Sequence, residues 1–158
     1  MVHDHEHFMR LAFEEARRGG SLGNMAVGAV IVRGGEVVAR GHNEASSTFD
    51  VTAHAETVAI RKLSTRLRVL NPGMRAGEGP LASCTLYATV EPCPMCCWAA
   101  CVAGISTVVI GATYARLGIS RGGYSAETLI SMTGQPVMVV SGVLEDECAA
   151  LRLGSSTT

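Results

Sequence analysis

The sequence has little charge, and neither sign prevails. Asp, Glu, Lys and Arg make up 17% of the 158 residues, hydrophobic residues make up 47%, and the formal net charge is −1. A protein that binds many phosphates carries a visible excess of Lys and Arg, so this balance predicts that nucleic acid is not a partner. A surface so poor in charge also predicts that a second copy covers part of it, as in a homodimer.

Long hydrophobic runs and a secretion signal are missing as well. The most apolar stretch, residues 98–113, is too short to span a bilayer and contains two glycines. Residues 1–15 mix charged and apolar side chains and lack the order of a signal peptide. The six cysteines form no regular disulfide framework. We therefore expect a cytoplasmic protein with reduced thiols and no membrane partner.

Hydrophobic periodicity predicts the element order α-β-β-α-β-α-β-α-β-α. Helices are expected over residues 8–16 (ended by Gly19 and Gly20), 53–67 (with Thr52 as N-cap), 94–103, 125–132 and 144–151. Strands are expected over residues 25–32, 36–40, 84–90, 106–112 and 136–141. A two-residue turn at Gly34 and Gly35 predicts an antiparallel hairpin, and the later helix crossings predict parallel pairing. The fold class is α/β, a three-layer α-β-α sandwich around one mixed five-stranded sheet. One domain is expected over residues 1–153, with a frayed tail over 154–158.

Three segments without periodicity, residues 41–51, 71–80 and 113–124, are expected to be loops. Four basic residues gather at the far end of the helix predicted over 53–67: Arg61, Lys62, Arg66 and, just beyond it, Arg68. We attribute them to the helix dipole rather than to a nucleic-acid patch. The alternating His3, His5 and His7 are attributed to a solvated helix end rather than to a metal site.

The stretch from Thr89 to Trp98 carries the chemistry. Cys93 and Cys96 form a C-x-x-C at the start of a predicted helix, where residues three apart share a face and both thiols can reach one point. A helix N-terminus also lowers the pKa of a thiol, which favours the thiolate that a metal needs. His54 offers a third ligand, and Glu56 lies two residues further on. Three protein ligands favour a zinc site that keeps one position open, as catalytic sites do.

Other interpretations of these residues stay open. Cys97 could be a fourth ligand, which would make the zinc structural, but consecutive helix residues point about 100° apart and favour packing away from the metal. A redox C-x-x-C would need no His54 and Glu56 elsewhere in the chain. Glu56 could merely oppose the helix dipole. With both cysteines present, we favour a catalytic Glu56 that carries protons for the reaction.

The paired motifs Ala53-His54-Ala55-Glu56 and Glu91-Pro92-Cys93-Pro94-Met95-Cys96 resemble the cytidine deaminase-like superfamily. The resemblance covers residues 8–151 and points to the branch of cytosine, guanine and tRNA adenosine deaminases. It implies the sandwich fold, a bound zinc ion held by His54, Cys93 and Cys96, and hydrolytic loss of an exocyclic amine as ammonia. It also implies substrate contacts from three sites: the Asn43 side chain, the Ala55 backbone N–H and the Glu91 backbone carbonyl.

The identity of the base is the finer question. Residues 50–56 resemble the guanine and tRNA adenosine deaminases more than the fungal cytosine enzyme. The run after Gly111 (Ala-Thr-Tyr-Ala-Arg-Leu-Gly) lacks the Asp-x-Lys-Thr-Gly-Ala pattern usual in the tRNA enzymes. We therefore expect a small-molecule nucleobase such as guanine or cytosine, or a related amino-heterocycle. A tRNA-specific adenosine deaminase is the alternative, and a non-catalytic, zinc-stabilised binding module is the alternative of another class.

Overall fold

The computed structural model describes residues 4–75 and 79–154. Along the chain the elements are α1 (His5–Ser21), β1 (Gly28–Arg33), β2 (Glu36–His42), α2 (Ala45–Thr48), α3 (Ala55–Leu70), β3 (Cys84–Val90), α4 (Pro94–Ala103), β4 (Thr107–Ala112), α5 (Tyr114–Leu117), α6 (Ala126–Thr133), β5 (Met138–Val140) and α7 (Glu145–Gly154). No helix within these residues is long and apolar enough to cross a membrane.

The five strands form one mixed sheet in the order β2-β1-β3-β4-β5. β1 pairs antiparallel with both β2 and β3, while β3–β4 and β4–β5 are parallel. Gly34 and Gly35 have φ values of 59° and 83°, the positive values that a tight hairpin turn requires. The predicted hairpin and the predicted parallel side of the sheet are both confirmed.

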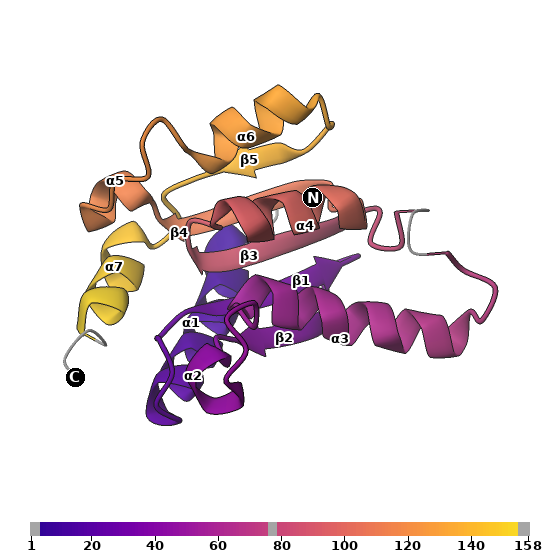
Figure 1. The fold of residues 1–158 in the computed structure, drawn as a ribbon, viewed down its shortest axis with the longest axis horizontal. Helices are drawn as coiled ribbons and strands as arrows, with labels where there is room; N and C mark the ends of the chain where they lie inside the picture. Colours follow the sequence, from indigo (N-terminus) through magenta and orange to yellow (C-terminus); the bar gives the residue numbers. More distant parts are fainter. Residues whose placement is uncertain (1–3, 76–78, 155–158) are drawn as a thin grey trace.

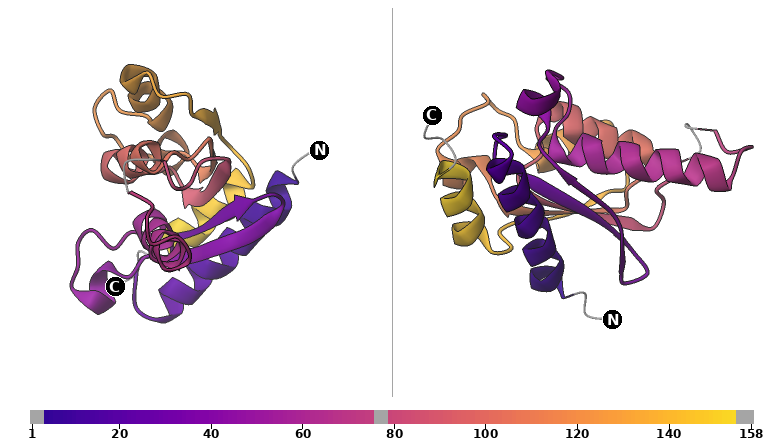
Figure 2. Two further views of the ribbon diagram at one scale, coloured as in Figure 1. Left: turned by 90° about the vertical axis from the view of Figure 1, so that its right-hand side faces the viewer. Right: turned by 90° about the horizontal axis from the view of Figure 1, so that it is seen from below.

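Helices cover both faces of the sheet, which confirms the three-layer sandwich. α3 and α4 lie side by side on one face, and α1 and α7 lie on the other, as Figure 1 and the two further views in Figure 2 show. α6 packs beside α4. The two helices that begin with the sequence motifs, α3 and α4, therefore share one face and one end of the sheet.

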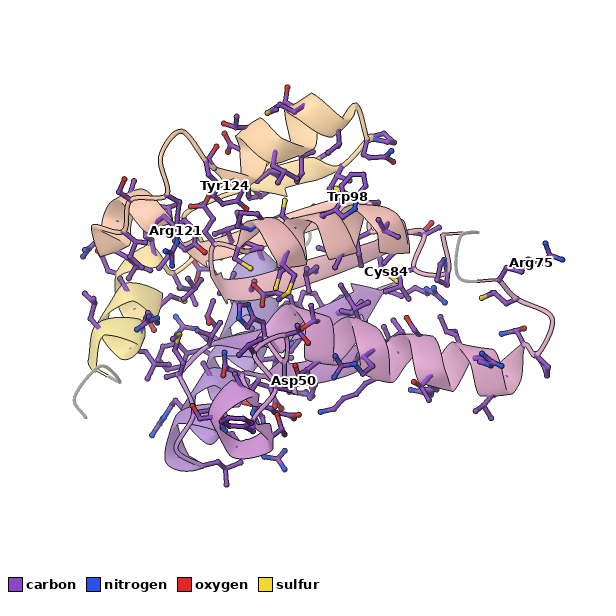
Figure 3. All side chains as sticks on the ribbon, in the orientation of Figure 1. Asp50, Arg75, Cys84, Trp98, Arg121 and Tyr124 are labelled. Atoms are coloured by element: carbon purple, nitrogen blue, oxygen red, sulfur yellow. The ribbon has the colours of Figure 1, made fainter. Side chains whose placement is uncertain are left out.

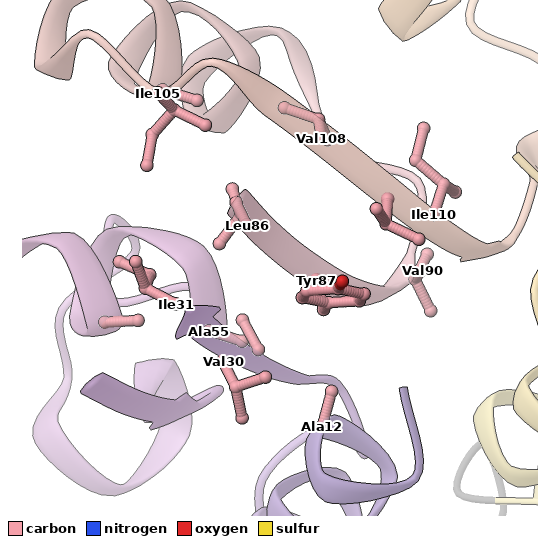
Figure 4. Close-up of a cluster of buried hydrophobic side chains, with 14 of the residues drawn as sticks. Ala12, Val30, Ile31, Ala55, Leu86, Tyr87, Val90, Ile105, Val108 and Ile110 are labelled. Carbon is pink, nitrogen blue, oxygen red and sulfur yellow. The ribbon is translucent and has the colours of Figure 1, made fainter. Parts of the chain in front are cut away.

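The core lies between the sheet and its helices. Central strands are buried on both faces, so β1 and β3 are nearly continuous apolar runs rather than alternating ones. Figure 4 shows the middle of this core, where Val30, Leu86, Tyr87 and Ile110 are all at most 1% exposed. Burying side chains of this size contributes about 1.5–3 kcal/mol each, so the sheet that carries the motifs is well anchored.

The prediction that Gly19 and Gly20 end the first helix is wrong, because α1 continues through both to Ser21. The reason is tertiary. A Cβ on Gly19 would lie 2.9 Å from Cβ of His42, closer than side chains approach one another. Gly19 therefore provides room for the end of β2 beneath α1, and this contact is worth more than the helix propensity that glycine lacks.

Thr52 is not the N-cap of the second long helix. α3 begins at Ala55 with His54 in the N-cap position, because Thr52 is held outside the helix by Asp50, whose Oδ1 accepts from Thr52 N (2.8 Å) and Oγ1 (2.6 Å). Two segments expected to be loops contain single helical turns, α2 and α5. Of the expected tail, Gly154 is the last residue of α7, and residues 155–158 lie outside the described part.

The histidine run is not a solvated helix end throughout. His3 lies outside the described residues, but Nδ1 of His5 is 3.0 Å from the hydroxyl of buried Tyr87. His5 thus satisfies a hydroxyl at the edge of the core. Burial also raises the pKa of Tyr87 to about 12, so this hydroxyl stays protonated near neutral pH.

Candidate metal centre and active site

Three side chains meet where α3 and α4 begin. His54 is the N-cap of α3, Cys93 is the N-cap of α4, and Cys96 lies in the first turn of α4. Nδ1 of His54 is 3.5 Å from Sγ of Cys93 and 3.5 Å from Sγ of Cys96. All three ligand atoms lie within 4.8 Å of one another, so the structure brings together the three residues that the sequence predicted as metal ligands.

These separations fit a zinc ion. Tetrahedral zinc with a Zn–S bond of about 2.3 Å and a Zn–N bond of about 2.1 Å separates its sulfur and nitrogen ligands by about 3.6 Å. Both nitrogen–sulfur separations therefore match those around a bound zinc ion. One imidazole and two thiolates also suit zinc better than magnesium or calcium, which prefer oxygen ligands.

The electrostatics of the two thiols match this assignment. The hydrogen bond with Cys96 lowers the pKa of Cys93 to about 4, and the same bond, together with burial, raises the pKa of Cys96. Cys93 is therefore the thiolate of the pair, and the hydrogen bond to it raises the pKa of His54. A divalent cation displaces the protons that such groups share, because its ligands bind as thiolates and neutral imidazole.

Glu56 lies beside the ligands and not among them. Its side chain is 3% exposed, and burial raises the pKa of its carboxyl. It lies in the first turn of α3, two residues after His54, and its charge contributes to the raised pKa of both His54 and Cys96. No carboxylate belongs to the three-ligand group in the described part of the chain. This geometry suits a proton carrier better than a fourth ligand.

Cys97 points away from the cluster, as its position in the helix predicted. Its Sγ lies 3.8 Å from the carbonyl of Ala126, at the start of α6, and the residue is 1% exposed. Burial raises the pKa of Cys97 to about 11, so it is a neutral thiol of the core. The site keeps three protein ligands.

Asn43 and Ala55, two of the predicted substrate contacts, border the site. Asn43 is buried directly after β2, and its Oδ1 accepts from Ala45 N, which leaves its amide NH₂ without a partner in the described residues. Ala55 is the first residue of α3, so its N–H has no acceptor within the helix. Both groups are available to a ligand, and their predicted roles stay predictions.

Glu91 has a second connection that the sequence analysis missed. Its backbone carbonyl was the predicted contact, but its buried carboxylate accepts from Tyr114 N and from Ala126 N, each at 2.8 Å. These are the first residues of α5 and α6. Glu91 therefore holds two helices against the end of β3. The only sequence signal was an acidic residue directly after a buried strand.

The segment that joins α5 to α6 borders the site. The hydroxyl of Tyr124 donates to the carbonyl of Pro92, next to Cys93. Arg121 lies over the ring of Tyr114, with Cζ 5.8 Å from the ring centroid. Figure 3 shows Arg121 and Tyr124 together between α4 and α5. Burial raises the pKa of Tyr114 to about 12, so it is a neutral phenol beside the metal ligands.

A three-ligand zinc site with a buried glutamate beside it, on an α-β-α sandwich, defines a metal-dependent hydrolase. A model of the family described as the cytidine and deoxycytidylate deaminase zinc-binding region matches residues 2–112, which is more than half of the chain. The chain belongs to this family of deaminases. Its sandwich is the cytidine deaminase-like fold that the resemblance of the motifs implied.

Two of the curated proteins that the chain is similar to are tRNA deaminases. The chain is 35% identical over 151 residues to the tRNA-specific adenosine deaminase of Bacillus subtilis, covering 92% of this chain and 84% of that protein. It is 37% identical over 159 residues to the chloroplastic tRNA(adenine(34)) deaminase of Arabidopsis thaliana, covering 91% of this chain but only 12% of that longer protein.

Solved structures agree on the fold. One from a study of A-to-I editing by tRNA:A34 deaminases has a TM-score of 0.73 and 35% identity, covering 92% of this chain and 98% of the other. A guanine deaminase from Nitrosomonas europaea has a TM-score of 0.76 over 95% of this chain and 83% of its own, but only 23% identity, so it supports the fold alone.

Proposed function

We propose that this protein is a zinc-dependent hydrolase that removes the exocyclic amine of adenosine in the anticodon loop of a tRNA, releasing ammonia. The observation that carries the proposal is the 35% identity to a tRNA-specific adenosine deaminase over 92% of the chain, which includes the zinc cluster. This is the alternative that the sequence left open, and it takes the place of the free base as our first choice.

The residues divide the chemistry among them. His54, Cys93 and Cys96 would hold the zinc ion, which when bound lowers the pKa of a water molecule from about 15.7 towards neutrality. Glu56 would take one proton from the attacking water and pass it to the ring nitrogen, and would then take the proton of the hydroxyl group left on the ring carbon and pass it to the amine, which departs as ammonia. One buried carboxylate can serve both steps, because it lies beside the cluster without being a ligand.

The remaining groups would orient the base. The amide NH₂ of Asn43 and the N–H of Ala55 are donors at the site, and the carbonyl of Glu91 would accept from the amine that leaves. Pairing with the polar edge of the base discriminates strongly, because a wrong base leaves buried polar groups without partners. Glu91 acts in addition as a positioning residue, since its side chain fixes α5 and α6.

A free base such as guanine or cytosine is the second candidate. The absence of an Asp-x-Lys-Thr-Gly-Ala run after Gly111 favours it, as does the net charge of −1. In the structure, the residues that stand after Gly111 instead of that pattern include α5, whose first N–H donates to the Glu91 carboxylate. Recognition of RNA would therefore need groups other than those that the resemblance implied.

The test compares kcat/KM for an adenosine-34 anticodon stem-loop, adenosine, guanine and cytosine at about 150 mM salt, with ammonia release as the readout and Glu56→Gln as the blank. Preference for the stem-loop by about tenfold or more, with rates that fall as salt rises, is the expected result. A higher kcat/KM for a free base than for the stem-loop would overturn the proposal in favour of the second candidate. Bound zinc without ammonia from any substrate points to a binding module.

A further inference from the structure

A loop of residues 44–53 joins two groups of the site. It begins after Asn43 and ends before the metal ligand His54, and the N–H of Glu44 donates to the carbonyl of Ala53 at 2.9 Å. This bond closes the neck of the loop. The loop is thereby fixed to the rim of the site at both ends.

The loop is also held by bonds within itself and by Asn24, which follows the end of α1. The side chain of Asn24 exchanges two hydrogen bonds with Ser47, at 3.1 Å and 3.0 Å. Asp50 binds the N–H and hydroxyl of Thr52, and its carbonyl accepts from Ala53 N at 3.0 Å. So many local bonds give the tip of the loop one preferred conformation.

That conformation displays apolar side chains to solvent. Phe49 is 98% exposed and has a φ of 56°, a left-handed conformation that is unfavourable for any residue with a Cβ. Val51, two residues further, is 82% exposed. Because these side chains are exposed, no buried apolar contact compensates for the strained backbone of Phe49. Residues whose surroundings hold them in a strained conformation are concentrated at functional sites.

A row of positive charge begins beside the same loop. Residues 57–77 contain no Asp or Glu, and the exposed basic residues along α3 and just beyond it, here called the basic face, are Arg61, Lys62, Arg66, Arg68 and Arg75. Hydrogen bonds from Thr52 and, to a lesser degree, the charge of Arg61 lower the pKa of Asp50, the neighbour of Phe49. Figure 3 shows Asp50 near the start of α3 and Arg75 beyond its far end.

We propose that Phe49 stacks on an unpaired RNA base next to the target adenosine, and that the basic face of α3 binds the phosphates of the strand that continues from it. The inference rests on the proposed function, and it supplies the RNA contacts that the run after Gly111 lacks. Aromatic side chains beside basic tracks are the usual means of holding single strands, and anticodon-loop bases are unpaired. A second copy of the chain is a poorer occupant, because a twofold contact centred on this loop would bring two basic faces together.

The test uses the full-length, zinc-loaded chain in a Glu56→Gln background and an anticodon stem-loop with 2-aminopurine in place of the base after adenosine-34. Stacking quenches 2-aminopurine, so the parent protein is expected to quench it on binding. Phe49→Ala is expected to abolish the quenching and to weaken binding by about 5- to 100-fold, whereas Phe49→Trp retains both. Phe49→Ala keeps its fold, because a side chain that is 98% exposed packs on little.

Val69→Ala is the matched control, since this apolar residue at the end of α3 is 75% exposed and lies away from the loop; it is expected to bind and quench like the parent. Unchanged quenching in Phe49→Ala overturns the inference and leaves the proposed function standing if the wild type deaminates the stem-loop. Failure of every form to bind RNA overturns both. Loss of binding together with dissociation in sedimentation would place Phe49 between copies of the chain instead.

Discussion

At the scale of single residues, position relative to the zinc cluster separates ligands from neighbours. His54, Cys93 and Cys96 converge on one point, Glu56 lies beside it, and Cys97 is turned into the core. Two substitution experiments follow from this arrangement.

Replacing Glu56 with Gln is expected to retain zinc and fold but to lower kcat by about 10²- to 10⁴-fold, because a proton carrier is lost and no ligand is removed. Steady-state ammonia release and metal analysis on the same preparation measure both quantities. Loss of zinc from this variant would show that Glu56 is a ligand, contrary to the assignment.

Replacing Cys96 with Ser is expected to release the zinc ion, since a thiolate ligand is removed. Cys97→Ser is the matched control one residue away, and it is expected to keep about one zinc per chain because its Sγ faces the carbonyl of Ala126. Metal content after dialysis against a chelator distinguishes the two. The reverse result would mean that the other thiol faces the site.

At the scale of elements, the site depends on how helix ends are held. α3 and α4 each begin at the cluster, and Gly41 allows the first of them to approach the sheet, since a Cβ there would lie 2.4 Å from the carbonyl of Ala55. α5 and α6 begin at the carboxylate of Glu91. Four helix N-termini thus meet around the ends of β2, β3 and β4, where their partial positive charge favours negative groups such as the Glu91 carboxylate.

Replacing Glu91 with Gln is expected to lower the free energy of unfolding by about 1–3 kcal/mol, because one acceptor becomes an NH₂ group that faces a buried backbone N–H. Urea unfolding monitored by circular dichroism measures the difference. Glu127→Gln, an exposed position in the first turn of α6, is the control and is expected to stay within about 0.5 kcal/mol of wild type. Equal stability of both variants would contradict a holding role for Glu91.

At the scale of the whole molecule, two exposed surfaces of the described residues bear on the partners of the protein. One is the basic face of α3 with Phe49 nearby. The other is an apolar patch formed by Met95, Trp98 and Val102 of α4 and Met132 of α6, which are between 38% and 83% exposed. The helices that carry this patch pack against each other, so the patch is continuous with the helix that holds Cys96.

A homodimer through this patch remains our prediction, because exposed apolar side chains on adjacent helices gain free energy when a partner covers them. Sedimentation at micromolar protein is expected to show a species of twice 16.5 kDa, and Val102→Glu is expected to reduce it to the single chain. Val69→Glu, at the end of α3, is the control that leaves the assembly intact. A wild-type species of only 16.5 kDa would count against the prediction.

The sequence by itself determined the metal ligands and most of the architecture. Cys93 and Cys96 share a helical turn, so their convergence follows from helix geometry, and the alternation of apolar runs with helical periods predicts one mixed sheet. His54 and Glu56 completed a pattern whose chemistry requires a metal ligand and a proton carrier together. Each of these features depends on residues that are close together in the chain, so each can be predicted from the sequence alone.

Only the tertiary structure decided where distant segments touch. Gly19 is part of α1 because His42 packs against it, Thr52 lies outside α3 because Asp50 holds it, and the Glu91 carboxylate joins two helices that begin 23 and 35 residues later. The exposed Phe49 follows from a loop that Asn24 and Ser47 fasten to the end of α1. Each outcome depends on a contact whose partner is remote in sequence, and local propensities of about 1 kcal/mol per residue are too weak to oppose such contacts.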